Sequence, residues 1–447
     1  MRRLLFRAFR WTWVVQQWLS RRFTRAGYLV LGGILAASVV GLDTNRTLAY
    51  QAFAFLVVLL AVALAASLTL RGRFSVRRSV PRFGTVGEPL VYKVIVANQG
   101  RRAQSGLTLL EDTADPRPSL EEFLAAREPG EERRNWFDRR VGYPRWMWLI
   151  ERRRGARFPE TPVPPLLPGG DAEVRVEALP VRRGRLRLVR VTLARPDPFG
   201  LFRGFLRVPA LQSLLILPRR YPVPDLDLPG TRRYQQGGVA LAASVGDSEE
   251  FASLRDYRPG DPLRRIHWRS WARVGKPIVK EYQDEFFVRH ALVLDTFGGA
   301  GPPEVFEEAV SVAASFAVAI PSQDSLLDLM FVGPEAYCFT AGRGLAHADR
   351  MLEVLAGVEP CVGKPFSALR NAVLERYGEL SGAICVLLAW DAERRALVEA
   401  LRGAGVPTLT LVVVPADATA PAGEDGDPGL GPHRLTVGQI PEGLARL

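Results

Sequence analysis

The chain has 447 residues and a formal net charge of +12. Its length exceeds that of one ordinary domain and predicts two or three compact units. Its three cysteines, Cys338, Cys361 and Cys385, are too widely spaced for a CxxC metal site, and their odd number argues against a disulfide framework. The basic excess could indicate a nucleic-acid partner. However, much of it lies in the first 82 residues beside two apolar runs, where orientation in a membrane explains it better.

The two apolar runs, residues 26–42 and 48–70, follow a basic and aromatic N-terminal segment. As helices they would be roughly 26 and 34 Å long, against a hydrocarbon core of about 30 Å. We therefore predict an interfacial segment over residues 1–25 and a transmembrane α-hairpin over 26–70. Arginines at both outer ends predict a multi-pass protein of the cell (inner) membrane with its soluble domains in the cytoplasm. Buried helices of a soluble protein and a cleaved signal peptide are the alternatives.

Residues 75–217 alternate short apolar strands with Gly and Pro turns, which predicts an antiparallel β-sandwich-like domain. The strand candidates are residues 90–97, 107–110, 172–179, 186–193 and 211–217. A charged, proline-rich insertion over residues 115–168 interrupts the pattern. It is either a surface insertion or lid, or a basic and aromatic arm that returns to the membrane surface.

A connecting segment, residues 218–285, contains the densest motif of the chain, residues 250–281. In this motif six arginines and two tryptophans surround a Pro-Gly-Asp turn, where proline presets φ and glycine tolerates a positive φ. So many arginines require carboxylates, phosphates or another protein as partners. The candidate interaction residues are Arg255, Tyr257, Pro259, Gly260, Asp261, Arg264, Ile266, His267, Trp268, Arg273, Lys280 and Glu281.

The motif Arg-x-Tyr-x-Pro-Gly-Asp-x-x-Arg-x-Ile-His-Trp, which begins at Arg255, resembles the signature of the domain of unknown function 58 (DUF58) family. Residues 180–185 and 197–202 also look like segments of that family. The resemblance implies a membrane-anchored protein with a von Willebrand factor A-like C-terminal domain. It further implies a MoxR-type AAA+ ATPase as a partner, often alongside a transglutaminase-like membrane protein.

Residues 286–447 alternate continuous apolar strands with helical patterns, which predicts a doubly wound α/β domain. This order is similar to that of a von Willebrand factor A-like domain. The predicted strands are residues 288–294, 326–332, 383–389 and 408–414, and the predicted helices are residues 303–320, 345–355, 367–377 and 392–404. Residues 416–432 are rich in Gly, Pro, Ala and Asp and predict a loop.

In von Willebrand factor A domains an Asp-x-Ser-x-Ser motif, a threonine and a further aspartate hold a divalent metal. The corresponding motif here is Asp295-Thr-Phe-Gly-Gly299, in which Phe297 and Gly299 replace two hydroxyls. Asp295, Ser367 and Asp391 are therefore the candidate ligands of a degenerate site. Because Mg²⁺ requires near-octahedral oxygen coordination, we expect little or no metal binding and no other cofactor. Asp295 would otherwise cap a helix or hold an arginine of the signature.

The sequence lacks the GxxxxGK[ST], HExxH and post-strand GxGxxG patterns. An enzyme would have to use the signature cleft, with His267 as general base and Asp261 orienting it. Alternatively, His267 and Trp268 pack between the domains. In that case Arg264 and Arg269 would form ion pairs with carboxylates such as those of Asp284 and Glu285. Nucleic-acid binding is a third class that we do not expect. We predict a non-enzymatic membrane-anchored scaffold or adaptor whose A-like domain docks partners and works with the ATPase in complex assembly or maturation.

Overall fold

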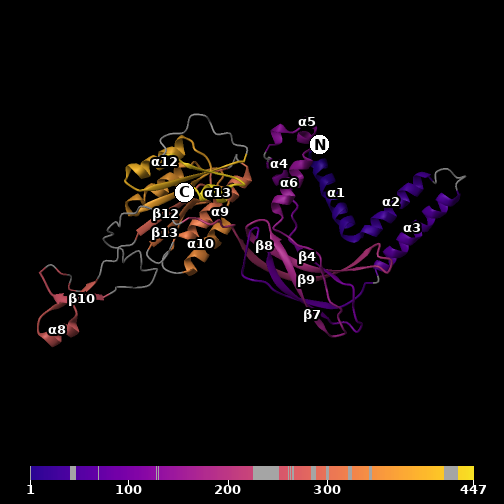
Figure 1. The fold of residues 1–447 in the computed structure, drawn as a ribbon, viewed down its shortest axis with the longest axis horizontal. Coiled ribbons are helices and arrows are strands. Elements are labelled where there is room, and N and C mark those ends of the chain that lie inside the picture. Colours follow the sequence, from indigo (N-terminus) through magenta and orange to yellow (C-terminus); the bar gives the residue numbers. More distant parts are fainter. Residues whose placement is uncertain are drawn as a thin grey trace. The chain divides into compact units, whose positions relative to one another are not determined.

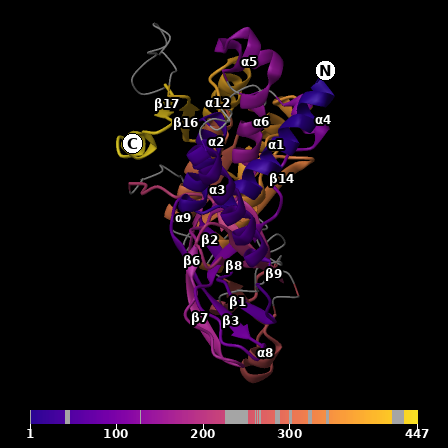
Figure 2. The same ribbon diagram turned by 90° about the vertical axis from the view of Figure 1, so that its right-hand side faces the viewer.

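The structure is a computed structural model that describes residues 2–40, 47–68, 70–126, 128, 130–224, 251–259, 261, 263, 266–282, 288–298, 302–320, 325–341, 345–416 and 431–447. The chain divides into two compact units. The first is built mainly from Met1–Arg220, and the second mainly from the residues that follow. Each unit is described by itself (Figures 1 and 2).

Three helices begin the first unit: α1 (Arg2–Arg22), α2 (Arg25–Val40) and α3 (Thr47–Ser67). Helices α2 and α3 lie side by side (Figure 1). In the described part of the chain, α3 is the one helix that is long and apolar enough to cross a membrane. Helix α2 has 16 residues and is therefore about 24 Å long, which is shorter than the hydrocarbon core. Within the described residues, only the second predicted span thus forms a helix of membrane-crossing length; the end of the first span, residues 41–42, and most of the expected loop at residues 43–47 lie outside them.

The β domain of this unit contains two sheets that share one hydrophobic core. One sheet has the order β1-β3-β7-β5 and the other β2-β9-β8-β4-β6 (Figure 2). Alternate residues of β3, from Leu90 to Val96, are buried, as expected for a strand with one face on the core. The strands are β1 (Phe74–Ser79), β2 (Phe83–Thr85), β3 (Leu90–Asn98), β4 (Thr108–Thr113), β5 (Ala156–Arg157), β6 (Thr161–Pro162), β7 (Asp171–Pro180), β8 (Gly184–Pro196) and β9 (Arg203–Leu217).

All five predicted strands of this domain are present, but the prediction of a purely antiparallel domain was wrong in one detail. Strand β2 pairs with β9 in parallel. The predicted insertion is also shorter than residues 115–168, because its last part supplies β5 and β6 to the two sheets. Both strands are only two residues long, too short for an alternating pattern to mark them in the sequence.

The rest of the insertion is helical, with α4 (Leu120–Ala125), η1 (Glu131–Arg133), α5 (Trp136–Val141) and α6 (Tyr143–Arg153). Ser119 begins α4 with a capping box, in which its side chain and that of Glu122 each accept a bond from the other's backbone N–H. These helices pack on α1 through a small aromatic core. Its members are Phe6, Phe9, Phe123, Trp146, Leu149 and Ile150.

A tight loop joins the β domain to the helices. The Asp197 carboxylate accepts hydrogen bonds from the backbone N–H of Phe199, Leu201 and Phe202, which fixes residues 197–202 in a turn. Phe202 then pairs with Phe23, between α1 and α2, while the Thr24 hydroxyl donates to the Gly200 carbonyl at 2.5 Å. The loop therefore anchors the β domain directly at the start of α2.

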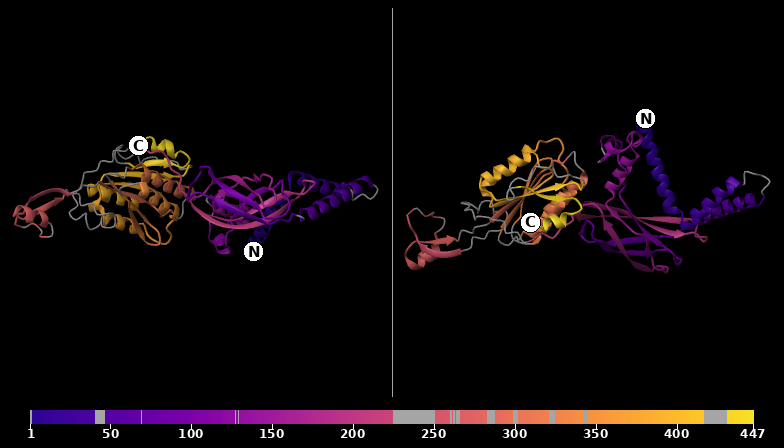
Figure 3. Two further views of the ribbon diagram at one scale, coloured as in Figure 1. Left: turned by 90° about the horizontal axis from the view of Figure 1, so that it is seen from below. Right: turned by 45° about the horizontal axis from the view of Figure 1, so that its top comes forward.

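The second unit contains a six-stranded sheet with the order β14-β13-β12-β15-β16-β17 (Figures 1 and 3). All neighbours are parallel except β13 and β14. The elements are β12 (Val288–Leu294), α9 (Pro303–Ala319), β13 (Ser325–Val332), β14 (Ala336–Ala341), α10 (Leu345–Gly357), α11 (Ser367–Leu374), η4 (Tyr377–Glu379), β15 (Gly382–Leu387), α12 (Ala392–Gly403), β16 (Thr408–Val414), β17 (His433–Thr436) and α13 (Ile440–Leu444).

This arrangement confirms the predicted doubly wound sheet. From β12 and β15 the chain steps outward in opposite directions, to β13 and β16. Right-handed crossovers therefore place α9 and α12 on opposite faces of the sheet. Every predicted strand and helix of this domain is present, whereas β14, β17 and α13 were not predicted. Most of the predicted loop over residues 416–432 lies outside the described residues.

The signature forms a small module of its own, with β10 (Phe251–Asp256), α8 (Trp268–Val274) and β11 (Ile278–Tyr282). The two strands pair in an antiparallel ribbon, and α8 lies in the connection between them (Figure 1). Gly275 ends the helix in the left-handed conformation, with φ of 73°.

Candidate functional sites

The signature turn is held by an ion pair between Arg255 and Asp261. The Arg255 guanidinium donates from Nη1 to Oδ2 at 2.7 Å and from Nη2 to Oδ1 at 2.8 Å. Asp261 also accepts from the Arg258 backbone N–H at 2.8 Å. The bonds from Arg255, followed by the backbone bond from Arg258, lower the pKa of Asp261 to about 2. Asp261 is therefore ionised at neutral pH and closes the turn.

His267 and Trp268 lie at the start of α8. The backbone N–H of His267 donates to the Ile278 carbonyl at 2.8 Å, and its Nδ1 lies 2.6 Å from the Ser270 hydroxyl. Among the described residues, the structure thus brings Asp261 together with Arg255 and Arg258, and His267 together with Ser270. It does not pair His267 with Asp261 as an enzyme would require.

Other signature residues shape the module or lie on its surface. Trp268 is 64% exposed and stacks on Trp271, with 5.1 Å between the ring centroids. Ile266 is buried and pairs with Val279. The Tyr257 backbone N–H donates to the Pro277 carbonyl. Pro259 and Arg273 are exposed. In the ribbon, Lys280 of β11 pairs with Leu254, and Glu281 pairs with Ser253. Gly260, Arg264, Asp284 and Glu285 lie outside the described residues.

The second candidate site lies at the carboxyl ends of β12 and β15, where the strand order reverses. Asp295 follows β12 and is fully buried. Its Oδ1 accepts from the Phe297 backbone N–H at 2.9 Å. Its Oδ2 accepts from the Leu388 backbone N–H at 3.0 Å and from Arg394 Nε at 2.6 Å. Asp391 follows β15 and caps α12 by accepting from the Arg394 backbone N–H at 3.0 Å.

Arg394 lies between these two carboxylates. Its Nη1 forms an ion pair with Asp391, and its guanidinium carbon lies 4.8 Å from the centre of the Phe366 ring. Burial by itself lowers the pKa of Arg394, but the hydrogen bond and charge of Asp295 outweigh this effect and raise the pKa above its ordinary value. The structure therefore holds a permanent cation between two of the three predicted metal ligands.

The third predicted ligand, Ser367, is the first residue of α11, directly after Phe366. The described residues contain no cluster of three or more His, Cys, Asp or Glu side chains that could hold a metal ion. The alternative that Asp295 holds an arginine agrees with the structure, although this arginine belongs to α12 and not to the signature. The spacing Asp391-x-x-Arg394 after an apolar strand could have indicated the pair.

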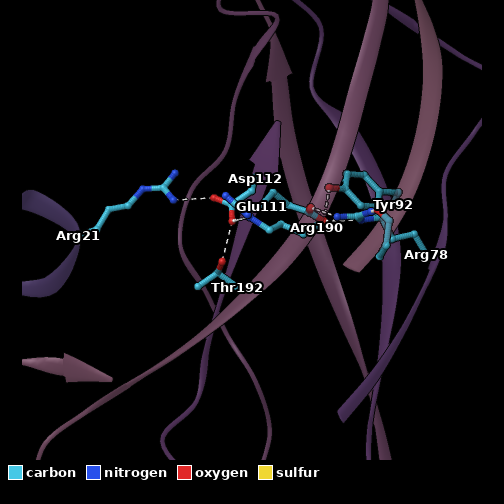
Figure 4. A network of polar contacts seen from close by, with 8 residues as sticks. Arg21, Arg78, Tyr92, Glu111, Asp112, Arg190 and Thr192 are labelled. Atoms are coloured by element: carbon cyan, nitrogen blue, oxygen red, sulfur yellow. Dashed lines mark hydrogen bonds and ion pairs between the residues drawn. The ribbon is translucent and has the colours of Figure 1, made fainter. Parts of the chain in front are cut away.

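A third polar cluster, in the β domain, was not singled out from the sequence (Figure 4). Glu111 of β4 accepts from Arg78 of β1 at 2.6 Å and from the Tyr92 hydroxyl of β3 at 2.8 Å. The Arg78 and Glu111 side chains are each 1% exposed. Burial, together with the Glu111 charge, raises the pKa of Tyr92. The cluster thus joins the two sheets through the core and is structural.

The adjacent residue, Asp112, ties α1 to the β domain (Figure 4). It accepts from Arg21 at 2.6 Å, from Arg190 at 3.0 Å and from the Thr192 hydroxyl at 2.6 Å. Burial raises the pKa of Asp112, but these bonds outweigh it, so that the pKa lies below its ordinary value. Asp112 therefore holds the last turn of α1 as a carboxylate.

Comparison with known proteins places the signature and much of the α/β domain in one match. Residues 253–397 match the family described as "Protein of unknown function DUF58". The chain is also similar to "Uncharacterized protein YeaD" of Bacillus subtilis (strain 168), with 30% identity over 126 residues. This match covers 28% of this chain and 31% of that protein, so the chain matches less than a third of the length of this curated relative.

Three solved structures are each similar to about a third of the chain. A CARDB domain from Pyrococcus furiosus covers 30% of this chain, with 12% identity and a TM-score of 0.16. A PapD-like domain of human CEP192 covers 33%, with 14% identity and a TM-score of 0.18. WR4, a member of the MSP family of C. elegans, covers 33%, with 9% identity and a TM-score of 0.15.

Proposed function

We propose that this protein is a membrane-anchored scaffold or adaptor whose C-terminal domain docks partner proteins. The observation that supports this best is the ion cluster at the carboxyl edge of the sheet. Ligands of open α/β sheets bind at this edge, near the point where the strand order reverses. Here Arg394 already neutralises Asp295 and Asp391, so the interior of the site is satisfied by the chain's own side chains. A partner would therefore be recognised by the exposed residues of the loops around this site, which we call the rim.

The rim carries an exposed apolar side chain suited to protein contact. The loop between α10 and α11 is fastened to the site, because the Cys361 backbone N–H donates to the Thr296 carbonyl at 2.8 Å. The next residue, Val362, is 85% exposed. The Lys364 ammonium in the same loop is bonded to the Pro334 carbonyl. A fastened loop that presents an apolar side chain loses little entropy when a partner covers it.

The proposal includes a von Willebrand factor A-like fold for residues 286–447, which the order of strands and helices supports. It also includes a membrane hairpin formed by α2 and α3, with the soluble domains in the cytoplasm. Helix α2 is short for a span, but thinning of the bilayer and snorkelling of flanking arginines accommodate such a mismatch. The basic flanks at residues 2–25 and 71–82 support the orientation.

The proposed partner is a MoxR-type AAA+ ATPase, alongside a transglutaminase-like membrane protein, as the family resemblance implies. In this proposal the ATPase assembles or matures a complex, and the present protein recruits it to the membrane.

Affinity purification of the full chain from native membranes, with and without ATP, tests the proposal. We expect an ATPase to co-purify with the wild type and to be lost with Val362→Asp. Val318→Asp is the matched control, because Val318 is an exposed valine near the end of α9, away from the carboxyl edge. Equal recovery with both variants would show that the rim is not the docking surface. Absence of any ATPase in both nucleotide conditions would overturn the partnership.

A further inference from the structure

Helix α1 has two apolar faces, and the described residues cover mainly one of them. Phe6 and Phe9 are 8% and 9% exposed, and they pack with Trp13 against α4 and α6. This face is the one expected of a helix in a folded domain.

The opposite face of α1 is apolar as well, but it is exposed. Leu4 is 69% exposed, Trp11 68%, Val14 44% and Trp18 46%. Successive members of this set are seven, three and four residues apart, a spacing that places them on one side of an α-helix. At 100° per residue the mean direction of this side is turned roughly 150° from that of Phe6, Phe9 and Trp13. Leu4, Trp11 and Val14 therefore form a stripe that no described element covers, and the half-exposed Trp18 continues it while also packing against Phe23 and Phe202.

The position of α1 shows what this stripe faces. Helix α1 ends at Arg22, and α2 begins at Arg25, where the loop at residues 197–202 fixes the junction. From this junction α1 and the α2–α3 pair diverge like the arms of a V (Figures 1 and 3). Helices α4 and α6 pack on the outer side of α1, away from α2 and α3 (Figure 1). The exposed stripe therefore lies on the inner side, toward the space around the apolar helices.

The charge of α1 indicates that the exposed stripe faces an anionic lipid surface. The helix contains no Asp or Glu, and Arg3, Arg7 and Arg10 are exposed. Trp side chains are enriched where a bilayer meets water, and Arg side chains reach the headgroups from such positions. A protein partner would fit an apolar stripe equally well, but it would not account for the continuity with α2 and α3.

We propose that α1 lies in the interfacial layer of the bilayer, with Leu4, Trp11, Val14 and Trp18 among the lipids. Its arginines then contact anionic headgroups, and α4–α6 form a lid on its cytoplasmic side. This inference rests on the proposed membrane anchoring by α2 and α3. It adds a lipid-binding surface and gives the insertion a role, namely to cover the face of α1 that the lipids do not.

Spin-label accessibility in nanodiscs tests the proposal on the full chain. The three native cysteines are replaced by alanine, and single cysteines are introduced as Trp11→Cys on the stripe and Thr12→Cys on its flank. Thr12 is the matched control, because it is an exposed neighbour on another side of α1. A third label, Phe55→Cys, reports on α3, where Phe55 is 67% exposed. The nanodiscs contain phosphatidylcholine with or without phosphatidylglycerol.

We expect oxygen to relax the label at residue 11 several-fold more effectively than a water-soluble nickel chelate does, and the reverse at residue 12. The contrast should increase with phosphatidylglycerol. Equal nickel accessibility at residues 11 and 12, with residue 55 in lipid, would overturn the inference and leave the membrane anchor intact. If residue 55 were also accessible to nickel, the proposed anchor itself would fail. Burial of residue 11 from both oxygen and nickel would indicate a protein cover and would also overturn the inference.

Discussion

At the scale of single residues, Arg394 is the most informative side chain of the C-terminal domain. It supplies a charge and directed donors to two carboxylates, and it does so without the dehydration that a divalent cation would require. The buried Asp295 consequently has three donors. Removing the guanidinium would leave that carboxylate with its backbone bonds alone.

We therefore expect Arg394→Ala to destabilise the domain by about 3–5 kcal/mol, the usual effect of breaking one side of a buried ion pair. Arg395→Ala should change stability by less than about 0.5 kcal/mol, because Arg395 is an exposed neighbour on α12. Urea unfolding of the full chain in detergent, followed by tryptophan fluorescence, measures both. Mg²⁺ should stabilise Arg394→Ala but not the wild type, since only the variant leaves two carboxylates without a cation. Similar losses in the two arginine variants would refute the assigned role.

Asp261 makes the stability of the signature module depend on pH in the acidic range. Its pKa is about 2 in the folded module and has an ordinary value of 3.8. A carboxyl group with a lowered folded pKa contributes its stability in full above the ordinary pKa, and that contribution is lost as the pH falls through the folded pKa. We expect the module to loosen between about pH 4 and pH 2, with a change in the fluorescence of the stacked Trp268 and Trp271. Asp261→Asn should remove this titration, and an unchanged acid transition in that variant would contradict the assignment.

At the scale of elements, the loop at residues 197–202 and the strand that follows it fit closely against two helices. A Cβ on Gly27 of α2 would lie 2.1 Å from the Leu201 carbonyl oxygen. A Cβ on Gly204 of β9 would lie 2.4 Å from the Ser67 carbonyl oxygen at the end of α3. Backbone meets backbone at both places, so a side chain at either position would have to push the elements apart.

Gly27→Ala should therefore lower stability by about 1–3 kcal/mol, the range for overpacking. Gly32→Ala is the matched control on the same helix, because no described atom outside the neighbouring backbone of the helix lies within 4 Å of the added Cβ. Alanine favours a helix over glycine by roughly 1 kcal/mol, so the control should not destabilise. The Tm of the full chain in nanodiscs distinguishes the two variants. A lower Tm for Gly32→Ala than for Gly27→Ala would show that the close approach is absent.

Local sequence patterns predicted most helices and strands, but not which residues far apart in the sequence contact each other. The run at residues 408–414 became β16 with the same bounds, because a continuous apolar strand is recognisable by itself. Strand β14 was missed because it is an edge strand with a mostly exposed face. The Arg78–Glu111 and Arg394–Asp295 pairs join residues 33 and 99 positions apart, and local periodicity carries no information about such contacts.

At the scale of the whole molecule, the orientation in the membrane remains a prediction. Basic residues flank both outer ends of the apolar helices, so we expect residue 82 and Leu447 to be cytoplasmic. Reporter fusions after Arg82 and at Leu447 measure this, with a reporter that is active only in the periplasm and a second one active only in the cytoplasm. Periplasmic activity at either position would overturn the orientation.

The long strand β9 also has a mechanical consequence. Its first residues contact the end of α3, and its last residue leads along the chain toward the second unit. Tension between these points would be carried by the β9 backbone, which is already extended, so the β8–β9 ladder, from Pro196↔Arg203 to Gly184↔Ile216, would not have to rupture. Optical-tweezer pulling between residues 200 and 218 should accordingly release almost no length, whereas pulling between residues 184 and 218 should unzip the ladder and lengthen the chain, and equal extensions would contradict this. A force on the second unit would then reach helix α3 with the β domain still folded.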